Sequence, residues 1–172
     1  DNLNQYLVRQ EVRSGKIQRL TKAGRVVSHF DVGIDNKIVL LSSTTNEPYE
    51  LGVLEKGAYR NLSKHNPWVD NIALASTEAI EFPSKDGTIV HGLLIKPHNY
   101  KAGERYPTIM RLHGGPVSQS ASDFHFDWQL YAANGYVVVA PNFRGSSGKG
   151  LEFQKSTISD WGNLDRDDAI ST

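Results

Sequence analysis

Residues 108–116, TIMRLHGGP, and residues 136–148, YVVVAPNFRGSSG, decide the fold of this chain. Each stretch is an apolar run of strand character that ends in a glycine-rich turn. The second run is β-branched and apolar along its length, as a strand buried on both faces should be. A helix between two such strands makes a βαβ unit, so the strands over 108–112 and 136–140 are predicted to be parallel.

The helix that joins these strands is predicted from the spacing of its aromatic residues. Phe124, Trp128 and Tyr131 recur at i, i+4 and i+7, which places them on one face of a helix. Ser122 or Asp123 is the expected N-cap of this helix.

The residues on either side of this unit predict a hairpin and a further helix. Strands over 79–82 and 88–95 flank Lys85-Asp86-Gly87, a strong hairpin turn. A last helix is predicted to start near Trp161, because three aspartates follow in its first turns, where the helix dipole favours acids: Asp165, Asp167 and Asp168.

The first 75 or so residues read instead as short strands separated by turns, which is typical of antiparallel all-β structure. Gly15…Leu20 resembles Gly57…Leu62, an offset of 42 residues, and blades of β-propellers repeat at about 40–45 residues. A chance match within a small β-sandwich is the alternative, and the repeat alone does not decide between them. The expected strands cover 6–8, 16–20, 26–30, 37–41, 49–54 and 58–62.

Composition excludes several function classes. The chain has 19 basic and 19 acidic residues and a formal net charge of +0, so no nucleic-acid or membrane partner is expected. It has no cysteine, which removes disulfides, thiolate metal sites and a cysteine nucleophile. Its histidines lack metal-ligand spacing, so no metal site is expected. Because the chain opens without Met, we expect the natural N-terminus to be missing. We expect a soluble protein, and the sequence does not decide between cytoplasm and periplasm.

Three motifs together carry a resemblance to a known family. They are His113-Gly114-Gly115-Pro116, the run from Asn142 to Gly148, and Asp160-Trp161-Gly162 with Asp165 and Asp168. In this order and spacing the sequence resembles the prolyl oligopeptidase family of serine peptidases, most closely its acylaminoacyl-peptidase and dipeptidyl-aminopeptidase-like branch. The resemblance implies that residues 1–77 are the C-terminal blade or blades of a β-propeller. It implies that residues 78–172 are the N-terminal part of an α/β-hydrolase catalytic domain, truncated before the nucleophile.

The function implied by the resemblance is hydrolysis of short peptides through a Ser-Asp-His triad that lies beyond this chain. No cofactor is implied, the partner is a short peptide, and a homo-oligomer of the full-length protein stays open. The alternatives are an esterase of the same fold and a non-catalytic, propeller-containing binding module. The nucleophile of this fold sits in Gly-x-Ser-x-Gly, which this sequence lacks, so the chain alone is predicted to be inactive.

Gly115 is the candidate catalytic residue. Acyl transfer develops negative charge on the scissile carbonyl oxygen, and preorganised N–H groups stabilise it. In the hydrolase fold one donor comes from the loop after an early strand, and by resemblance this donor is the N–H of Gly115. His113 is expected to be structural, because the catalytic base of this fold follows the nucleophile along the chain.

Lys149 and Arg144 are the candidate substrate-binding residues. Several family members carry a tyrosine at the position of Lys149, and a flexible ammonium replaces a rigid phenol poorly; the alternative is an exposed loop lysine. Arg144 could pair with a substrate carboxylate or could anchor its loop to backbone and to an acid such as Asp160. A phosphate-binding loop is excluded, because Phe143 and Gly150 break its pattern.

Overall fold

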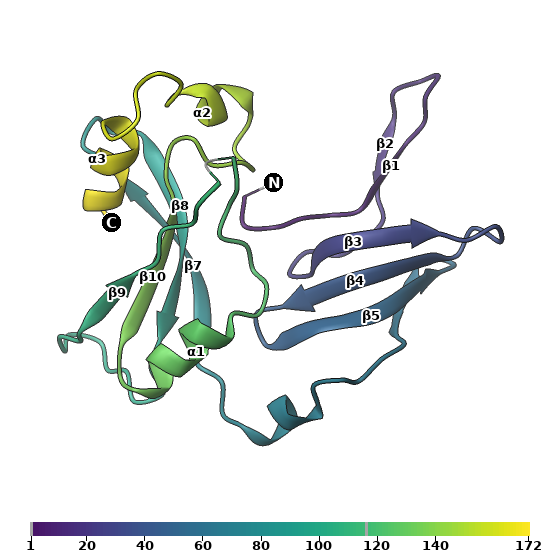
Figure 1. The fold of residues 1–172 in the computed structure, drawn as a ribbon, viewed down its shortest axis with the longest axis horizontal. Coiled ribbons are helices and arrows are strands. Elements are labelled where there is room, and N and C mark those ends of the chain that lie inside the picture. The colour runs from purple at the N-terminus through teal and green to yellow at the C-terminus, as the bar shows by residue number, and fades with distance from the viewer. Residues whose placement is uncertain (1, 116) are drawn as a thin grey trace. The chain divides into compact units, whose positions relative to one another are not determined.

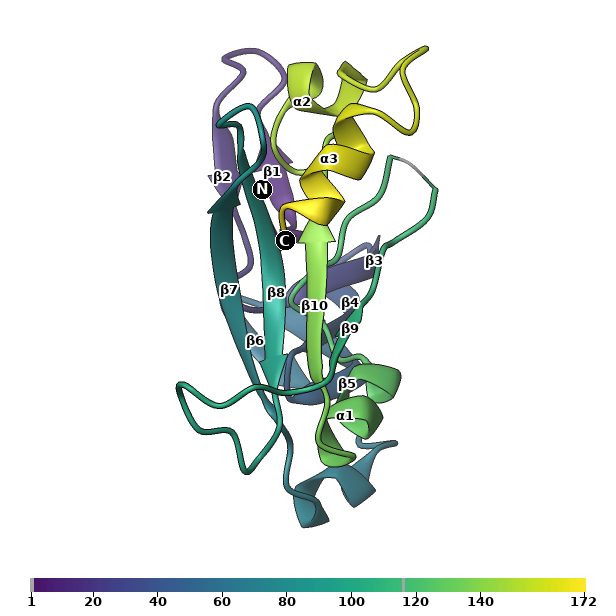
Figure 2. The ribbon, with the colours of Figure 1, turned by 90° about the vertical axis from the view of Figure 1, so that its left-hand side faces the viewer.

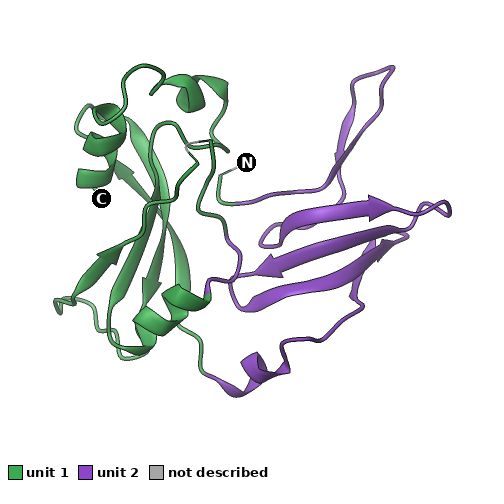
Figure 3. Ribbon diagram, in the orientation of Figure 1, with its two compact units in different colours: residues 1–3, 73–121, 126–172 green, residues 4–72, 122–125 purple. Residues whose placement is uncertain are grey.

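The computed structural model describes residues 2–115 and 117–172. The chain divides into two compact units, each made of more than one stretch of sequence (Figure 3). Unit 1 comprises residues 1–3, 73–121 and 126–172, and unit 2 comprises residues 4–72 and 122–125.

Unit 2 is built from antiparallel strands (Figure 1). A two-stranded ladder of β1 (Val8–Gln10) and β2 (Ile17–Arg19) precedes a four-stranded sheet whose order follows the sequence. The sheet consists of β3 (Val26–Val32), β4 (Ile38–Thr44), β5 (Glu47–Glu55) and β6 (Ala58–Asn61), and a short helix η1 (Pro67–Asn71) comes after it. The strands predicted from residue 16 onward are confirmed, whereas the first lies at Val8–Gln10 and not at 6–8. Four consecutive antiparallel strands match one blade at the end of a propeller.

The sheet of unit 2 packs on a small apolar core. Leu7, Val27, Leu40 and Leu54 are buried together. Three partly buried residues pack against this cluster: Leu20, Ile38 and Tyr59. Val39 of β4 and Leu51 of β5 are exposed, but burial does not alternate strictly, since Ser42 and Ser43 of β4 and Gly52, Val53 and Leu54 of β5 are all buried.

Unit 1 holds a four-stranded mixed sheet of order β7-β8-β10-β9 (Figure 2). Its strands are β7 (Ser76–Pro83), β8 (Ile89–Lys96), β9 (Thr108–Met110) and β10 (Val137–Asn142), and its helices are α1 (Phe126–Ala133), α2 (Leu151–Lys155) and α3 (Leu164–Ile170). The hairpin β7–β8 and the parallel pairing of β9 with β10 confirm the predictions. The predicted N-cap of α1 is wrong, because the helix begins at Phe126.

The core of unit 1 lies between the sheet and α1. All six residues of β10 are buried, as its apolar run predicts. Trp128 and Ala132 of α1, one helical turn apart, join Val138 and Ala140 of β10 in the core. Leu3 from the start of the chain is buried in the same cluster.

One glycine of the sheet is required by close packing of two strands. Gly92 of β8 pairs with Pro141 of β10. A Cβ atom at position 92 would lie 2.9 Å from the carbonyl oxygen of Ala140 and 3.0 Å from Cα of Pro141. No side chain fits there without separating the strands, so this position lets β10 approach β8 at the end where the site loops begin.

The parallel pairing of β9 and β10 brings the two glycine-rich turns together. Parallel neighbours end at the same edge of a sheet, and the turns that follow β9 and β10 leave from that edge, beside α2 and α3 (Figure 2). Ligands of open α/β sheets bind outside the carboxyl ends of the strands. The loop over 111–121, called the His-Gly-Gly loop below, and the loop over 143–150 therefore form the candidate site.

Candidate active site

His113 lies between the two loops and is held by the second. Its ring stacks on Phe143, with the centroids 4.6 Å apart and the planes at 11°. Its Nε2 atom lies 2.8 Å from Oγ of Ser146, and that hydroxyl donates to the carbonyl oxygen of Phe143 at 2.5 Å. A hydroxyl has one proton, so Nε2–H of the imidazole is the donor to Ser146. Burial lowers the pKa of His113; the carbonyl oxygen of Gly114, 3.3 Å from Nδ1, opposes the shift because only the protonated ring can donate to it from Nδ1.

Two further contacts fasten the His-Gly-Gly loop to β10 and its loop. The N–H of Ser147 donates to the carbonyl oxygen of Ser118 at 2.8 Å. The buried amide of Asn142 accepts from the N–H of Ser120 at 2.7 Å and donates to the carbonyl oxygen of Ser120 at 3.0 Å. Together with the His113–Ser146 bond, these contacts fix the backbone on both sides of Gly115.

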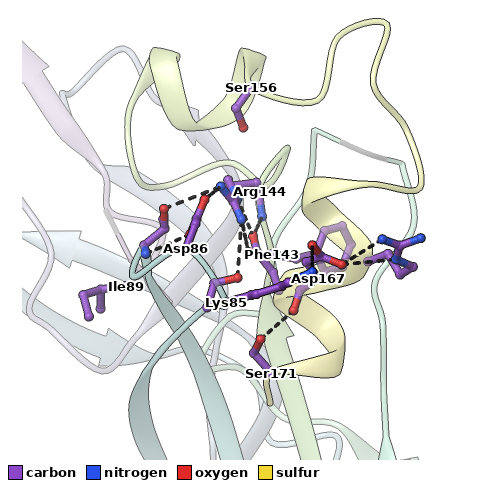
Figure 4. Close-up of polar contacts among 12 residues, drawn as sticks. Lys85, Asp86, Ile89, Phe143, Arg144, Ser156, Asp167 and Ser171 are labelled. Atoms are coloured by element: carbon purple, nitrogen blue, oxygen red, sulfur yellow. Dashed lines mark hydrogen bonds and ion pairs between the residues drawn. The ribbon is translucent and has the colours of Figure 1, made fainter.

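Arg144 is the buried anchor of the second loop (Figure 4). Its guanidinium donates to Asp168 of α3, with Nη2 to Oδ1 at 2.6 Å, and Nη1 donates to Asp86 of the β7–β8 turn at 2.5 Å. Its backbone N–H also donates to Asp168 at 2.7 Å, and Nη2 lies 3.3 Å from the hydroxyl of Ser84. The side chains of Arg144 and Asp168 are 8% and 0% exposed. The cluster ties a hairpin turn, a loop and a helix to one cation.

The charges in this cluster reinforce one another. Hydrogen bonding to Asp168 raises the pKa of Arg144 further, with Asp86 adding to the effect and burial opposing it. The backbone N–H of Thr88 and then the guanidinium of Arg144 lower the pKa of Asp86 to about 2. Because the guanidinium is directed at the protein's own carboxylates, the geometry favours anchoring over contact with a substrate. The acid that Arg144 meets is Asp168 and not Asp160, whose carboxylate accepts from the amide of Asn163.

Lys149 is partly buried, which differs from the exposed loop lysine considered as an alternative. Its ammonium donates to the carbonyl oxygen of Ile89. It also lies 4.8 Å from the ring centroid of Phe153. Burial lowers the pKa of Lys149, against the attraction of Glu81 and Asp168.

Gly115 adopts a conformation that favours glycine. Its φ is +95°, in the left-handed region, where an L-residue places its Cβ against the following carbonyl. A Cβ atom at this position would contact only Cβ of Ser118, at 3.7 Å, so the cost of a side chain is conformational and not a clash. Pro116, the last residue of the predicted motif, lies outside the described residues.

An apolar hollow adjoins the site on the side of α3. It has a volume of about 430 Å³, and Met110, Leu112, Phe143, Ala169 and Ile170 supply its apolar lining. Across residues 2–115 and 117–172, no group of three or more histidines and carboxylates could hold a metal ion. No helix in the described part of the chain has the length and apolar character needed to cross a bilayer.

Sequence reasoning found the two loops but missed the groups that hold them. The bond between His113 and Ser146 joins positions 33 residues apart, and nothing in the local sequence indicates it. Asp168 was predicted as one of several acids at a helix start and as part of a motif of the family, but not as the partner of Arg144. The arginine just after the buried strand, at Arg144, is the one signal that a buried acid would be needed.

Comparisons with known proteins agree with these motifs. Residues 122–172 match the sequence model of the prolyl oligopeptidase family. The chain is 30% identical to the peptidase YuxL of Bacillus subtilis over 147 residues, 84% of this chain and 22% of that protein. It is 29% identical to dipeptidyl-peptidase 5 of Aspergillus fumigatus over 160 residues, 90% of this chain and 22% of that protein.

Solved structures give the same result. An acylaminoacyl peptidase in complex with Z-Gly-Gly-Phe-chloromethyl ketone matches with a TM-score of 0.81 and 28% identity, over 92% of this chain and 25% of that one. The acylaminoacyl peptidase of Pyrococcus horikoshii matches with a TM-score of 0.80 and 28% identity, over the same shares of both chains. The chain thus spans about a quarter of the length of these relatives. With its motifs, its fold and these matches in agreement, the chain belongs to the prolyl oligopeptidase family.

Proposed function

We propose that residues 1–77 form the end of a β-propeller and that residues 78–172 begin an α/β-hydrolase domain. The antiparallel sheet β3–β6 in unit 2 and the sheet with parallel β9 and β10 in unit 1 support two parts of this kind, although unit 1 resumes at Ala73, before the proposed boundary, and includes residues 1–3. In the described part of the chain, β9 pairs on one side only, with β10. A further parallel strand of a hydrolase sheet would lie beside β9. The apolar hollow next to β9 and α3 is where the side chains of that strand would be buried.

The full-length protein that carries this chain is, on this proposal, a serine peptidase acting on short peptides of the aminoacyl or acylaminoacyl type. One observation carries the proposal. The His-Gly-Gly loop and the 143–150 loop meet at the carboxyl ends of two parallel strands, in a chain that follows the fold of acylaminoacyl peptidases over 92% of its length. A relative of that name binds a peptide chloromethyl ketone, which is a peptide-like ligand.

The chemistry assigned to this chain is stabilisation of the oxyanion. A serine on a later strand would attack the scissile carbonyl, and the carbonyl oxygen would become negative as the tetrahedral intermediate forms. The N–H of Gly115 is the proposed donor from this chain, and the residue after the nucleophile would supply the second donor. The hydrogen bonds that hold His113, Ser118 and Ser120 would keep this donor in place before substrate arrives, which is the condition for electrostatic catalysis.

The test uses the full-length protein. It should react with a fluorophosphonate probe at one serine and should release p-nitroaniline from aminoacyl or acylaminoacyl nitroanilides. Comparing N-acetylated, free aminoacyl and dipeptidyl substrates of the same P1 residue identifies the substrate type. Hydrolysis of p-nitrophenyl esters without any nitroanilide activity would indicate an esterase. Absence of both labelling and turnover would indicate a binding module.

A further inference from the structure

The peptide group that carries the proposed oxyanion donor is in contact with the side chain of His113. A peptide group is planar, so the carbonyl oxygen of Gly114 and the N–H of Gly115 are opposite ends of one rigid plane. Nδ1 of His113 lies 3.3 Å from that carbonyl oxygen. A change in the orientation of the imidazole therefore changes the space open to the carbonyl, and with it the direction of the N–H.

The place of His113 in its loop gives this contact its weight. The N–H of Arg111, two residues earlier, donates to the carbonyl oxygen of Val139 at 2.8 Å and so continues the pairing of β9 with β10. The two residues that follow His113 are glycines, which have the widest choice of backbone conformations. The turn at Gly115 therefore depends on anchors at both of its ends, and His113 is the anchor that directly precedes it.

The side chain of Ser146 fixes the orientation of this imidazole. The ring lies flat against Phe143, with 11° between the two planes, but a flat stack still permits the ring to flip by half a turn about its Cβ–Cγ bond. Such a flip would break the hydrogen bond of 2.8 Å between Nε2 of His113 and Oγ of Ser146. A neutral imidazole has one N–H, so the same bond also keeps the proton on Nε2 and off Nδ1. Burial lowers the pKa of His113, which favours this neutral ring.

Ser146 is itself held by the peptide group between Phe143 and Arg144. Its hydroxyl donates to the carbonyl oxygen of Phe143 at 2.5 Å, and its backbone N–H donates to the same oxygen at 3.0 Å. At the other end of that peptide group, the N–H of Arg144 donates to Oδ2 of Asp168 at 2.7 Å. Ser146 and Asp168 are both 0% exposed, so water does not compete for these bonds.

These bonds form one continuous line from a buried carboxylate to the His-Gly-Gly loop. The line runs from Asp168, through the peptide group that it holds and the hydroxyl of Ser146, to the imidazole. Every donor in it points towards the carboxylate, so each bond polarises the next in the same direction. An acid and a histidine orient the nucleophile of a serine peptidase. In this chain a second line of that kind ends at the peptide group of the oxyanion donor.

We propose that Ser146 is a positioning residue for the peptidase reaction, which orients the imidazole of His113 and through it the peptide group that carries the N–H of Gly115. This inference rests on the proposed function. All of the groups in it belong to unit 1. Ser146 itself touches no reacting atom, because it is fully buried.

The experiment compares Ser146→Ala with Ser156→Ala in the full-length enzyme. Ser156 is a matched control, because its hydroxyl also donates to a phenylalanine carbonyl three residues earlier, that of Phe153, at 2.7 Å. Each variant leaves its carbonyl one backbone donor, which for Phe153 is the N–H of Gly145 at 3.0 Å. Of the two hydroxyls, only that of Ser146 accepts an imidazole N–H in the described part of the chain.

The expected result is a loss of rate in one variant only. We expect kcat of Ser146→Ala, referred to the active sites titrated with a fluorophosphonate, to fall about 10- to 100-fold, the range in which small misplacements near a site reduce rates. We expect KM to change little, since an oxyanion donor acts in the transition state. Ser156→Ala should keep the kcat of the wild type.

A pair of ligands separates positioning from a loss of folded protein. A peptide aldehyde forms an adduct whose oxygen occupies the oxyanion site, whereas the alcohol of the same peptide forms no adduct. The inhibition constant of the aldehyde should rise in Ser146→Ala in parallel with the loss in kcat/KM, and that of the alcohol should stay unchanged. A purely structural role for Ser146 would lower the number of titratable sites and change neither constant.

Two substitutions of His113 test the same bond if Ser146→Ala folds poorly. The amide of a glutamine reaches the region of Nε2 and can donate to Ser146, whereas the amide of an asparagine reaches only the region of Nδ1. His113→Gln should therefore keep more of the wild-type kcat than His113→Asn. Equal values of kcat in these two variants would contradict the role of the bond.

The outcomes are distinguishable. An active wild-type enzyme whose Ser146→Ala variant matches Ser156→Ala in kcat per active site and in aldehyde affinity overturns the positioning role and leaves the proposed function intact. A wild-type protein without turnover or fluorophosphonate labelling overturns both, because no reaction remains for Ser146 to serve.

Discussion

Ser146 and His113 lie at the distance of a catalytic nucleophile and its base, but the hydroxyl of Ser146 does not donate to the imidazole as a nucleophile would. Oγ of Ser146 lies 2.8 Å from Nε2 of His113, but its proton is engaged by the carbonyl oxygen of Phe143 at 2.5 Å. Ser146 is also 0% exposed, so no substrate carbonyl can reach it. The hydrogen bond between the two side chains therefore serves to hold the two loops together.

Replacing Ser146 by alanine should therefore reduce stability and leave the nucleophile intact. The change leaves the imidazole N–H of His113 without its acceptor, which costs about 1–3 kcal/mol for a buried donor, while the carbonyl of Phe143 keeps its bond from the backbone N–H of residue 146 at 3.0 Å. Urea unfolding measures the loss, and a fluorophosphonate probe should still label the full-length variant. Loss of labelling in a variant of unchanged stability would identify Ser146 as the reactive serine and contradict this reading.

Replacing Asp168 should be among the most destabilising single changes in unit 1. Asp168→Ala leaves the cation of Arg144 buried with its main partner gone, and breaking a buried pair in this way costs about 3–5 kcal/mol. Asp86→Ala removes the other, more exposed carboxylate and should cost less. Unfolding free energies of both variants give the comparison, and an equal or larger loss for Asp86→Ala would show that the turn and not the helix is the main anchor.

In the full-length enzyme Gly115→Ala should damage catalysis more than Lys149→Ala. The left-handed φ of Gly115 costs about 1–2 kcal/mol for an L-residue, and loss of one oxyanion donor raises the barrier by about 3–4 kcal/mol. Lys149→Ala loses one hydrogen bond to Ile89, worth about 1 kcal/mol.

The neighbouring Gly114 provides the control for this comparison. It has no positive φ, and a Cβ atom there would meet nothing within 4 Å, so Gly114→Ala should be tolerated. The turnover numbers of the three variants on one peptide substrate decide the matter. A larger fall for Lys149→Ala would mean that the ammonium of Lys149, and not the N–H of Gly115, is the main donor to the oxyanion, and the donor would have to be reassigned.

Unit 2 should lose stability in acid through Glu50. Burial alone would raise the pKa of this carboxylate, but hydrogen bonds from Ser63, His65 and Asn66 outweigh it and lower the pKa to about 2. A lowered folded-state pKa contributes stability that is present above the unfolded value of 4.5 and is lost as pH falls towards 2. The protection factors of the amides of residues 63–71, which correct for the intrinsic pH dependence of exchange, should fall in the wild type between pH 5 and pH 2.5, and Glu50→Gln should lower them at pH 5 already. A wild-type profile that does not change with pH would rule out this role.

The 172-residue chain by itself should be inactive. It holds a proposed oxyanion donor but no Gly-x-Ser-x-Gly nucleophile, and loss of a triad reduces turnover by about six orders of magnitude. Incubation with aminoacyl nitroanilides and with a fluorophosphonate probe tests this. Covalent labelling of any serine of the chain would show that a nucleophile has been overlooked.

The strands were the part of the fold that the sequence predicts best. β10 is apolar from Val137 to Pro141 and is buried at every position, and the Lys85-Asp86-Gly87 turn joins β7 to β8 as its residues require. The start of α1 was mispredicted because Asp123 has the chemistry of an N-cap but is bound by Tyr49, 74 residues earlier. α2 was missed because a five-residue helix is too short to show periodicity.

The site was predictable where it depends on local backbone and not where it depends on distant partners. The glycines of the His-Gly-Gly motif indicate a turn, and Gly115 is left-handed there. The three acids at 165, 167 and 168 all suit a helix start, but only the phase of α3 decides that Asp168 is buried against Arg144 while Asp165 and Asp167 are not. That phase follows from packing, which a single sequence does not reveal.

The burial of Leu3 in the core of unit 1 bears on how this protein could be cut or recombined. Leu3 packs with Ala75, Trp128 and Val138 although 69 residues of unit 2 follow it, and the N–H of Asn2 donates to the carbonyl of Gly148 in the second site loop. A chimera that keeps residues 73–172 and replaces everything before them would lose the core side chain of Leu3. It would also lose the hydrogen bond from Asn2 that holds the second site loop. Exchange of modules between relatives should therefore carry both ends of the discontinuous unit together.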